Sequence, residues 1–506
     1  MNNTQSFTQS VATDTGTNAT HNDVECAPPS GINVLIVGAG VGGLVAALEC
    51  HRKGHHVRIF ERSLSASAGG DMFTVGLSAR RFVDHYPTLK QEYDDISLHD
   101  AHMQYRKWTG EPIGEAWPFS KMMGISGTID PHKLPMVSQI RPLFHAVLHY
   151  QVQRFGIEIA YGKRILEYYE DTTRGVGGVV DDRGERIEAD LVIAADGLHS
   201  HSRDVVLGGQ DQGTPSGKII FRAAWPLDTA MADPLVKEYF GLKDGKHPLM
   251  QGWLGPEIHT MLLSYVDKQG KNGRMCWGLN LNMPLDEDTN AKESWHHTVT
   301  SEYVLNAIER VPGFGEPMKA LIRTMPEDSI VEWPLLWRNP NPCTYSEGCR
   351  VLQIGDAAHS FLPASGNGAT QAIEDAITIA ACLQHAGMDD IPTAVKTHAL
   401  LRGDRVSCAQ FLGFYNAERF QKSDMKAVVT DPTKVNAKVP KWIWMSDPEI
   451  YANENYKEAA ASLGTEGSGF KNTNIPTGYV PEKWSIESIE ELHKQGKLVE
   501  LSGDWL

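Results

Sequence analysis

The sequence lacks the features that mark disulfide-rich, membrane-spanning and nucleic-acid-binding proteins. Its seven cysteines form no Cys-x-x-Cys pair, and their odd number argues against a disulfide framework, a zinc site or an iron–sulfur cluster. No apolar stretch reaches the roughly 18 residues that a membrane-spanning helix needs. A net charge of −16 means that the chain has no excess of the basic side chains that nucleic acids and anionic membranes attract. We therefore expect no metal site, no membrane span and no nucleic-acid partner.

The first residues also lack a basic segment followed by an apolar run, so no signal peptide is predicted. Together with the unpaired cysteines, this predicts a cytoplasmic protein in a reducing compartment. Residues 1–30 are rich in Ser, Thr, Asn and Gln and poor in large apolar side chains, which predicts a disordered tail. The sequence does not determine the oligomeric state, and a homodimer is left open.

The composition is that of an ordinary globular protein, and the first predicted strands and helix form a clear pattern. The chain has 506 residues, of which 41% are apolar, and this length is typical of two or three domains. The apolar run at residues 33–37 predicts a buried strand, residues 41–52 predict a helix, and residues 57–60 predict a second strand that leads to Glu61. These segments together predict the βαβ unit of a nucleotide-binding domain.

The middle of the chain has a different pattern of apolar and polar residues. Runs such as residues 218–223 and 259–265 alternate between apolar and polar side chains and are separated by Pro and Gly, which predicts a mostly antiparallel sheet. Residues 350–354 again resemble a buried strand, and residues 369–383 are apolar almost all round, which is typical of a buried helix. The nucleotide-binding domain is therefore predicted to be interrupted by a sheet domain and completed after it.

A glycine fingerprint, Gly38-x-Gly40-x-x-Gly43, lies between the first predicted strand and helix. In such a fingerprint the first glycine allows a tight turn, the second lets the backbone approach a pyrophosphate, and the third lets helix and strand pack closely. The helix N-terminus offers free N–H groups to the phosphates. Glu61, at the end of the second strand, is placed to accept hydrogen bonds from ribose hydroxyls.

Three more motifs accompany the fingerprint: Gln139-Ile140-Arg141, Asp196-Gly-x-x-Ser200-x-x-Arg203 and Gly355-Asp356-Ala-Ala-His359. In this order the four motifs resemble those of the group A FAD-dependent monooxygenases, the single-component hydroxylases related to para-hydroxybenzoate and salicylate hydroxylase. The resemblance extends over residues 32–415. It implies an α/β fold with a Rossmann-like FAD-binding domain interrupted by a mostly antiparallel β-sheet substrate domain, the para-hydroxybenzoate hydroxylase-like fold.

On this basis we expect the following division of the chain. Residues 1–30 form the tail, 31–205 the first part of the FAD-binding domain (with 72–130 partly in the substrate sheet), 206–345 the substrate-binding sheet domain, 346–424 the second part of the FAD-binding domain with further helices, and 425–506 a C-terminal extension.

The resemblance implies FAD as the cofactor and assigns roles to single residues. Asp356 resembles the carboxylate that binds the ribityl hydroxyls, Arg141 an arginine that reaches FAD, and Asp196 an aspartate that serves both FAD and the nicotinamide cofactor. A helix cap, a surface charge and an Asx turn are the respective structural alternatives. The residues implied to bind the cofactor are Gly38, Gly40, Gly43, Glu61, Arg62, Arg141, Asp196, Asp356, Pro363, Gly366, Gly368 and Ala369.

The family also implies the reaction. NADPH or NADH serves as a transient reductant, a flavin C4a-hydroperoxide forms, and one oxygen atom from O2 enters a small hydrophobic or aromatic substrate by hydroxylation or epoxidation. The length, the polar tail and the C-terminal extension are most similar to fungal members of secondary metabolite biosynthesis. Two residues are implied to be catalytic: Arg222, whose cation stabilises a phenolate or protonates an oxyanion, and Tyr265, which hydrogen-bonds a substrate oxygen. A strand-edge salt bridge and an ordinary buried tyrosine are the alternatives.

Other outcomes remain open on the same fold. They are Baeyer–Villiger-type oxygenation, a reductase that needs no oxygen, and a non-catalytic redox-sensing flavoprotein. Halogenation is disfavoured because the Trp-x-Trp-x-Ile-Pro motif of flavin halogenases is missing. The aromatic stretch Trp442–Asp447 resembles one found late in salicylate hydroxylase-like chains. We expect it to pack the extension onto the core, with a substrate lid or a dimer contact as alternatives.

Overall fold

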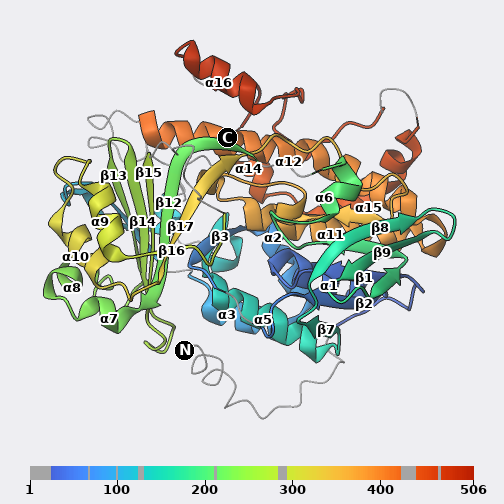
Figure 1. Ribbon diagram of the computed structural model, residues 1–506, viewed down its shortest axis with the longest axis horizontal. Coiled ribbons are helices and arrows are strands. Elements are labelled where there is room, and N and C mark those ends of the chain that lie inside the picture. The colour runs from blue at the N-terminus through green and yellow to red at the C-terminus, as the bar shows by residue number, and fades with distance from the viewer. Residues whose placement is uncertain are drawn as a thin grey trace.

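Two sheets stand side by side in the computed structural model of the chain (Figure 1). One is a parallel sheet with helices packed on one face, and the other is a large, mostly antiparallel sheet. Most of the predicted tail lies outside the described residues. The structure describes residues 24–66, 69–98, 101–122, 130–209, 213–282, 293–422, 440–464, 469–497 and 499–505.

The parallel sheet has five strands in the order β18-β11-β1-β2-β7. Its strands are apolar on both faces because helices cover one face and a smaller sheet formed by residues 165–171, 176–181 and 186–189 covers the other. Helix α1 packs against α11 and α5, and this contact region belongs to the largest apolar core of the described chain. The elements are β1 (Asn33–Val37), β2 (His56–Glu61), β7 (Glu158–Tyr161), β11 (Leu191–Ala194), β18 (Val351–Gln353), α1 (Val41–Arg52), α5 (Arg141–Arg154) and α11 (Gly368–Ala386).

The second sheet has eight strands in the order β16-β17-β12-β15-β14-β13-β4-β5. All neighbours are antiparallel except β13 and β4, which run parallel. The strands are β4 (His102–Lys107), β5 (Pro112–Pro118), β12 (Thr214–Pro226), β13 (Leu249–Gly255), β14 (Ile258–Tyr265), β15 (Arg274–Asn282), β16 (Thr298–Val299) and β17 (Ile330–Trp337).

The two faces of this sheet have different neighbours. In β12, Phe221 and Trp225 belong to the core beneath the small helices on the outer side of the sheet, whereas Arg222 and Ala224 line an internal cavity. This follows from the two-residue period of a strand. The helices, which lie on the side away from the parallel sheet in Figure 1, are α7 (Leu227–Met231), α8 (Pro234–Phe240), α9 (Ser301–Ile308) and α10 (Glu316–Arg323).

Smaller elements complete the fold. A two-stranded sheet of β3 and β6 and a three-stranded sheet of β10, β9 and β8 flank the parallel sheet, and the long helix α12 runs along the top of the view in Figure 1. They are β3 (Met72–Gly76), β6 (Met136–Ile140), β8 (Ile165–Asp171), β9 (Val176–Asp181), β10 (Arg186–Ala189), α2 (Leu77–Arg80), α3 (Pro87–Ile96), α4 (Phe119–Met122), α6 (Ser202–Leu207), α12 (Ile391–Lys422), α14 (Lys441–Trp444), α15 (Pro448–Ser462) and α16 (Ile486–Lys494).

The fold class predicted from the sequence is confirmed: a Rossmann-like parallel sheet is interrupted in the chain by a mostly antiparallel sheet. Strands β1 and β2 come first, β4 and β5 of the second sheet precede β7 and β11, and the rest of the second sheet lies between β11 and β18 in the sequence. None of the helices in the described ranges has both the length and the hydropathy of a membrane span.

Candidate active site

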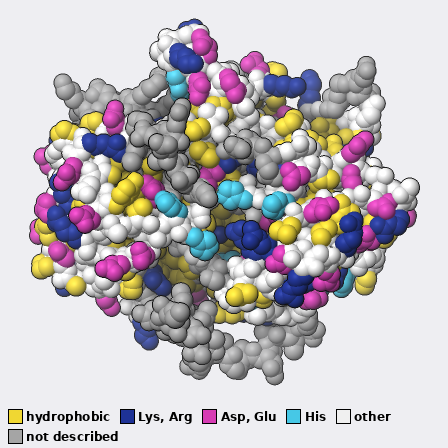
Figure 2. Space-filling view, viewed as in Figure 1, with side chains coloured by type: hydrophobic (Ala, Val, Ile, Leu, Met, Phe, Trp, Pro, Cys, Tyr) yellow, Lys and Arg dark blue, Asp and Glu magenta, His cyan; other side chains and the backbone are white. Residues whose placement is uncertain are grey.

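One large cavity of about 2820 Å³ is lined by residues of both sheets. Typical ligand pockets are about 300–1,000 Å³, so this volume has room for a dinucleotide and a substrate together. Figure 2 shows histidine and Lys or Arg side chains gathered around a hollow with hydrophobic side chains inside it, and the cavity lining includes His199, His201 and His296.

The glycine fingerprint forms one end of this cavity. Gly38 has φ +102°, and a Cβ atom there would lie 2.5 Å from the carbonyl oxygen of Ala195. A Cβ atom at Gly43 would lie 2.0 Å from the carbonyl oxygen of Gly38, so the third glycine lets α1 pack against the loop. Gly38 and Gly40 line the cavity, and a Cβ atom at Gly40 would meet no protein atom within 4 Å. The space beside Gly40 is therefore open for a ligand.

Glu61 connects the end of β2 to this loop. Its carboxylate accepts hydrogen bonds from the backbone N–H groups of Ala39 and Ser63, both at 2.8 Å. Glu61 and Arg62 line the cavity. The carboxylate is thus fixed by two backbone donors while it faces the space where a ribose would lie.

Asp196 follows β11 and also lines the cavity. The hydroxyl of Tyr168 donates to its carboxylate at 2.7 Å. Burial raises the pKa of Asp196, although the hydrogen bonds of Ser200 and Tyr168 act in the opposite direction. Arg203 of the same motif is 1% exposed and donates to the carbonyl oxygen of Asp356 at 3.4 Å, so it joins the Asp196 motif to the Gly355-Asp356 motif.

Asp356 lies just after β18 and faces the cavity. Burial raises its pKa, against the opposing charges of His359 and Arg141. His359 is not among the described cavity-lining residues. It is 6% exposed, and its Nε2 atom lies 2.6 Å from Asp375 of α11. Asp375 also accepts from the backbone N–H of Gly355 at 3.0 Å, so it fixes the loop from behind.

The N-terminus of α11 opens onto the cavity. Gly366 adopts φ +61°, a conformation that favours glycine, and its carbonyl oxygen accepts a hydrogen bond from the Thr74 hydroxyl at 3.0 Å. A long helix whose N-terminus faces a ligand stabilises negative charge there. The cavity lining includes the four residues predicted for this region, Pro363, Gly366, Gly368 and Ala369.

Two arginines converge on Asp71, which the sequence did not single out. Arg222 pairs with the Asp71 carboxylate through two contacts, one of them Nε to Oδ2 at 2.8 Å, and Arg141 donates its backbone N–H to the Asp71 carbonyl oxygen at 2.8 Å. The guanidinium carbons of Arg222 and Arg141 lie 5.0 and 5.8 Å from the Trp295 ring centre. All four residues line the cavity.

The charges in this group shift each other's pKa. Burial is the main cause that lowers the pKa of Arg141, and the positive charge of Arg222 lowers it further. For Arg222, burial acts to lower the pKa but the Asp71 carboxylate outweighs it, so the pKa is raised. Arg222 therefore remains a cation that is held in a fixed orientation by its bidentate partner.

Tyr265 has a different position from the one expected. It ends β14, is 2% exposed and packs in an apolar cluster with Met103, Met250 and Cys276. It is not among the described residues that line the cavity, whereas Met103 and Met250 are. Tyr265 thus lies behind the cavity wall, and its role as a catalytic hydroxyl stays a prediction.

The wall formed by the second sheet is mostly apolar. Met, Leu, Ile and aromatic side chains surround the charged pair of Arg222 and Asp71 on this side, and the buried pair of Arg338 and Glu293 also lines the cavity. Such a wall accommodates a hydrophobic molecule, and the arginine supplies one positive charge to it. The apolar residues lining this part are Met103, Tyr105, Ile220, Met250, Leu254, Met261, Trp295, Val331, Trp333 and Leu335.

Residues of all four predicted motifs therefore line one cavity, with Gly43 packed beneath it. Sequence reasoning missed Asp71, Trp295 and Asp375. Asp71 and Trp295 belong to no motif, so no local signal identifies them. Asp375 could have been noticed, because Glu374 and Asp375 are adjacent charges in an otherwise apolar helix and must be paired if they are buried.

Comparisons with known proteins agree with this geometry. Residues 36–94 match the family model of an NAD(P)-binding Rossmann-like domain. The chain is 40% identical over 483 residues to the FAD-dependent monooxygenase fsr3 of Gibberella fujikuroi, which covers 94% of this chain and 90% of that protein. It is 41% identical over 484 residues to the FAD-dependent monooxygenase dmxR9 of a Cryptosporiopsis species, with the same coverage.

Solved structures show similar chains. CtdE in complex with FAD and a substrate superposes with a TM-score of 0.74 at 26% identity, over 85% of this chain and 99% of that chain. A salicylate hydroxylase in a substrate complex has a TM-score of 0.63 at 21% identity, over 86% and 99% of the two chains. The second likeness is one of fold alone.

Proposed function

The chain belongs to the FAD-dependent monooxygenases, and from this premise we propose that it inserts one oxygen atom from O2 into a small hydrophobic or aromatic natural product. The observation that carries the proposal is the continuity of the cavity. A single space connects the glycine cradle at Gly38 and Gly40 to the apolar wall of the second sheet. A cofactor in the cradle and a substrate at the wall would share this space.

The residues present fit FAD. The open space at Gly40, the N-terminus of α11 and the carboxylates of Glu61, Asp196 and Asp356 offer what phosphates, flavin and sugar hydroxyls require. We propose that these residues and Arg141 hold the cofactor. When bound, FAD would accept electrons from NADPH or NADH and activate dioxygen, which is chemistry that no side chain supplies.

Arg222 is proposed to act on the substrate. Its guanidinium is fixed by Asp71 and lies at the apolar wall, where few other charges compete for a substrate oxygen. A positive charge there stabilises a phenolate or a developing oxyanion, and this interaction is strong because the site is buried. Asp71 is a positioning residue because it orients the guanidinium.

The reaction itself is tested with the FAD-loaded protein, NADPH or NADH, and a panel of phenols, indoles and polyketide acids. We expect substrate-dependent oxygen uptake and a product heavier by one oxygen atom. An ester or lactone product would instead establish Baeyer–Villiger-type oxygenation. Bound FAD that neither nicotinamide reduces would establish a non-catalytic flavoprotein.

The variant Arg222→Met tests the role of the cation. We expect kcat to fall about 100-fold, because one preorganised donor to an oxyanion contributes about that much. The FAD content should stay unchanged. Tyr265→Phe serves as the comparison, since Tyr265 lies behind the wall, and we expect its kcat to stay within about twofold. A drop for Tyr265→Phe that matches the drop for Arg222→Met would restore the tyrosine to the catalytic group.

A further inference from the structure

Helix α14, in the C-terminal extension, forms part of the cavity wall. Its first and last residues, Lys441 and Trp444, line the cavity, while Ile443 between them is 2% exposed and packs against α12 residues. The Trp444 side chain is half-buried and that of Lys441 is exposed. Residues far from the motifs in sequence thus reach the same space as the proposed cofactor site.

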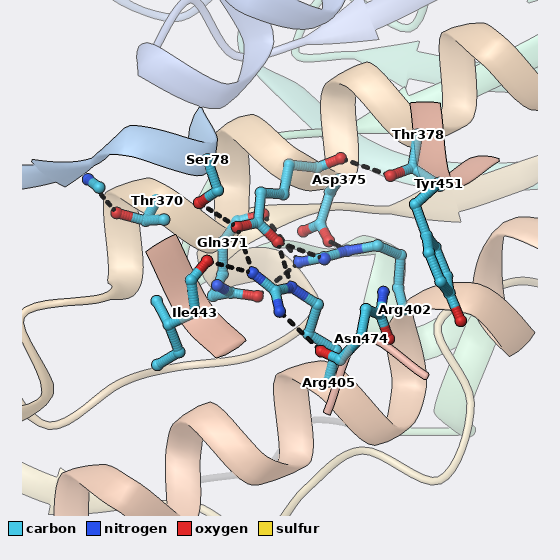
Figure 3. A network of polar contacts seen from close by, with 12 residues as sticks. Ser78, Thr370, Gln371, Asp375, Thr378, Arg402, Arg405, Ile443, Tyr451 and Asn474 are labelled. Atoms are coloured by element: carbon cyan, nitrogen blue, oxygen red, sulfur yellow. Dashed lines mark hydrogen bonds and ion pairs between the residues drawn. The ribbon is translucent and has the colours of Figure 1, made fainter. Parts of the chain in front are cut away.

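A buried ion network holds α14 in this position (Figure 3). Arg405 of α12 is fully buried and donates to the carbonyl oxygens of Trp442 at 2.8 Å and Ile443 at 2.7 Å. Its Nε and Nη2 atoms bond Glu374 of α11 at 2.7 and 2.9 Å. Ser78 of α2 donates to the same carboxylate at 2.7 Å. One arginine therefore joins α14 to the helix that begins at the cofactor site.

A second anchor follows immediately in the chain. The Asp447 side chain accepts from the backbone N–H groups of Glu449 and Ile450, both at 3.1 Å, and so caps α15. Glu449 pairs with Arg52 at 2.7 Å and with Lys53, both at the end of α1. The segment is held at both ends, so Lys441 and Trp444 are presented to the cavity as parts of a rigid wall.

Two exposed lysines, Lys441 and Lys133, lie at the rim of the cavity next to α2 and α14. Lys441 lies within ion-pair distance of no carboxylate in the part of the chain that the structure describes, and the same holds for Lys133, which also lines the cavity. Helix α2 joins the two: it contacts α14, and Leu77 donates to the Pro135 carbonyl oxygen at 2.8 Å. In a chain with net charge −16, this makes a local positive rim.

We propose that this rim selects the substrate: a planar aromatic molecule packs against Trp444, and its carboxylate or phenolate is held by Lys441 and Lys133. This inference rests on the proposed function and names the substrate class of the same cavity. Asp71 holds Arg222 at the inner wall, whereas the side chains of Lys441 and Lys133 are exposed, so these two lysines are the cations that an anion extending outward would meet. A flat ring on an indole face gains stacking energy in addition to burial.

The test measures binding, not turnover. The FAD-loaded full-length protein is titrated by calorimetry with 1-hydroxy-2-naphthoic acid and, separately, with its methyl ester. We expect the acid to bind about fivefold more tightly, since a partly exposed ion pair contributes up to about 1 kcal/mol. Lys441→Gln should remove most of this preference and leave the Kd of the ester unchanged. Trp444→Leu should weaken both ligands by the same factor.

Lys457→Gln is the matched control, because Lys457 is an exposed lysine on α15 that does not line the cavity. It makes the same change in net charge, and we expect it to keep the preference for the acid. The inference is wrong if the unaltered protein does not prefer the acid, or if the two lysine variants change its Kd equally. A failure of the oxygenation assay with intact acid preference would overturn the proposed function and leave this binding site standing.

Discussion

Gly43→Ala is expected to deprive the protein of FAD and of stability together. The new Cβ atom would lie 2.0 Å from the Gly38 carbonyl oxygen, far inside contact distance, and the neighbour is backbone that cannot rotate away. Helix α1 must then move away from the loop. Overpacking of this kind costs about 1–3 kcal/mol. If the loop that cradles the pyrophosphate absorbs the shift, FAD binding weakens about 10- to 100-fold.

Two other glycines separate these effects. A Cβ atom at Gly40 meets no protein atom within 4 Å, so Gly40→Ala should fold with unchanged stability. It should nevertheless bind FAD more weakly than the unaltered protein, because the methyl group occupies space that the ligand needs. Gly403 lies in α12, is exposed and has open space around it. Gly403→Ala should keep full FAD content and gain up to about 1 kcal/mol from helix propensity. The measurements are the flavin absorbance of the purified protein and its thermal unfolding. Full FAD content in Gly43→Ala would contradict the expectation.

Arg405→Met is expected to lower the free energy of unfolding by about 3–5 kcal/mol, because the buried carboxylates of Glu374 and Asp375 would then share Arg402, which leaves buried negative charge uncompensated. Arg405 and Glu374 are both fully buried. The positive charges of Arg405 and Arg402 outweigh the effect of burial and keep the pKa of Glu374 low, so it is ionised. The variant also removes the charged hydrogen-bond donor of the Trp442 and Ile443 carbonyl oxygens, so these oxygens lose that hydrogen bond.

Denaturant unfolding measures this loss, and hydrogen exchange across residues 440–447 measures the loosening of α14. Arg323→Met is the control, since Arg323 and Glu316 form an exposed pair on α10 at 2.6 Å whose loss should cost less than about 1 kcal/mol. Equal losses for the two variants would mean that the buried network contributes no more than a surface ion pair. Faster exchange of 440–447 in Arg405→Met alone would link the network to the cavity wall.

The local motifs could be predicted because each is a short-range requirement. A positive φ at Gly38, a close approach at Gly43 and a carboxylate at the end of a strand are properties of a few consecutive residues. The order of the motifs then predicted which strands belong to one parallel sheet, and the structure confirms that fold.

Tyr265 shows where this reasoning stops. The family resemblance singled out Tyr265, and it lies on the same face of β14 as His259 and Met261, which line the cavity. The position along the strand was not predictable. A strand advances about 3.3 Å per residue, so four residues beyond Met261 place Tyr265 past the end of the cavity, among apolar neighbours.

The sequence alone thus determined the FAD family, the two-sheet fold and the motifs that supply the proposed cofactor site, because these depend on local backbone geometry and strand periodicity. Only the tertiary structure revealed that Asp71 pairs with Arg222, that Asp375 fixes the loop of Asp356, and that Arg405 holds α14 at the cavity wall. These contacts join residues tens to hundreds of positions apart. Their geometry follows from how the sheets and helices pack, which no local pattern encodes.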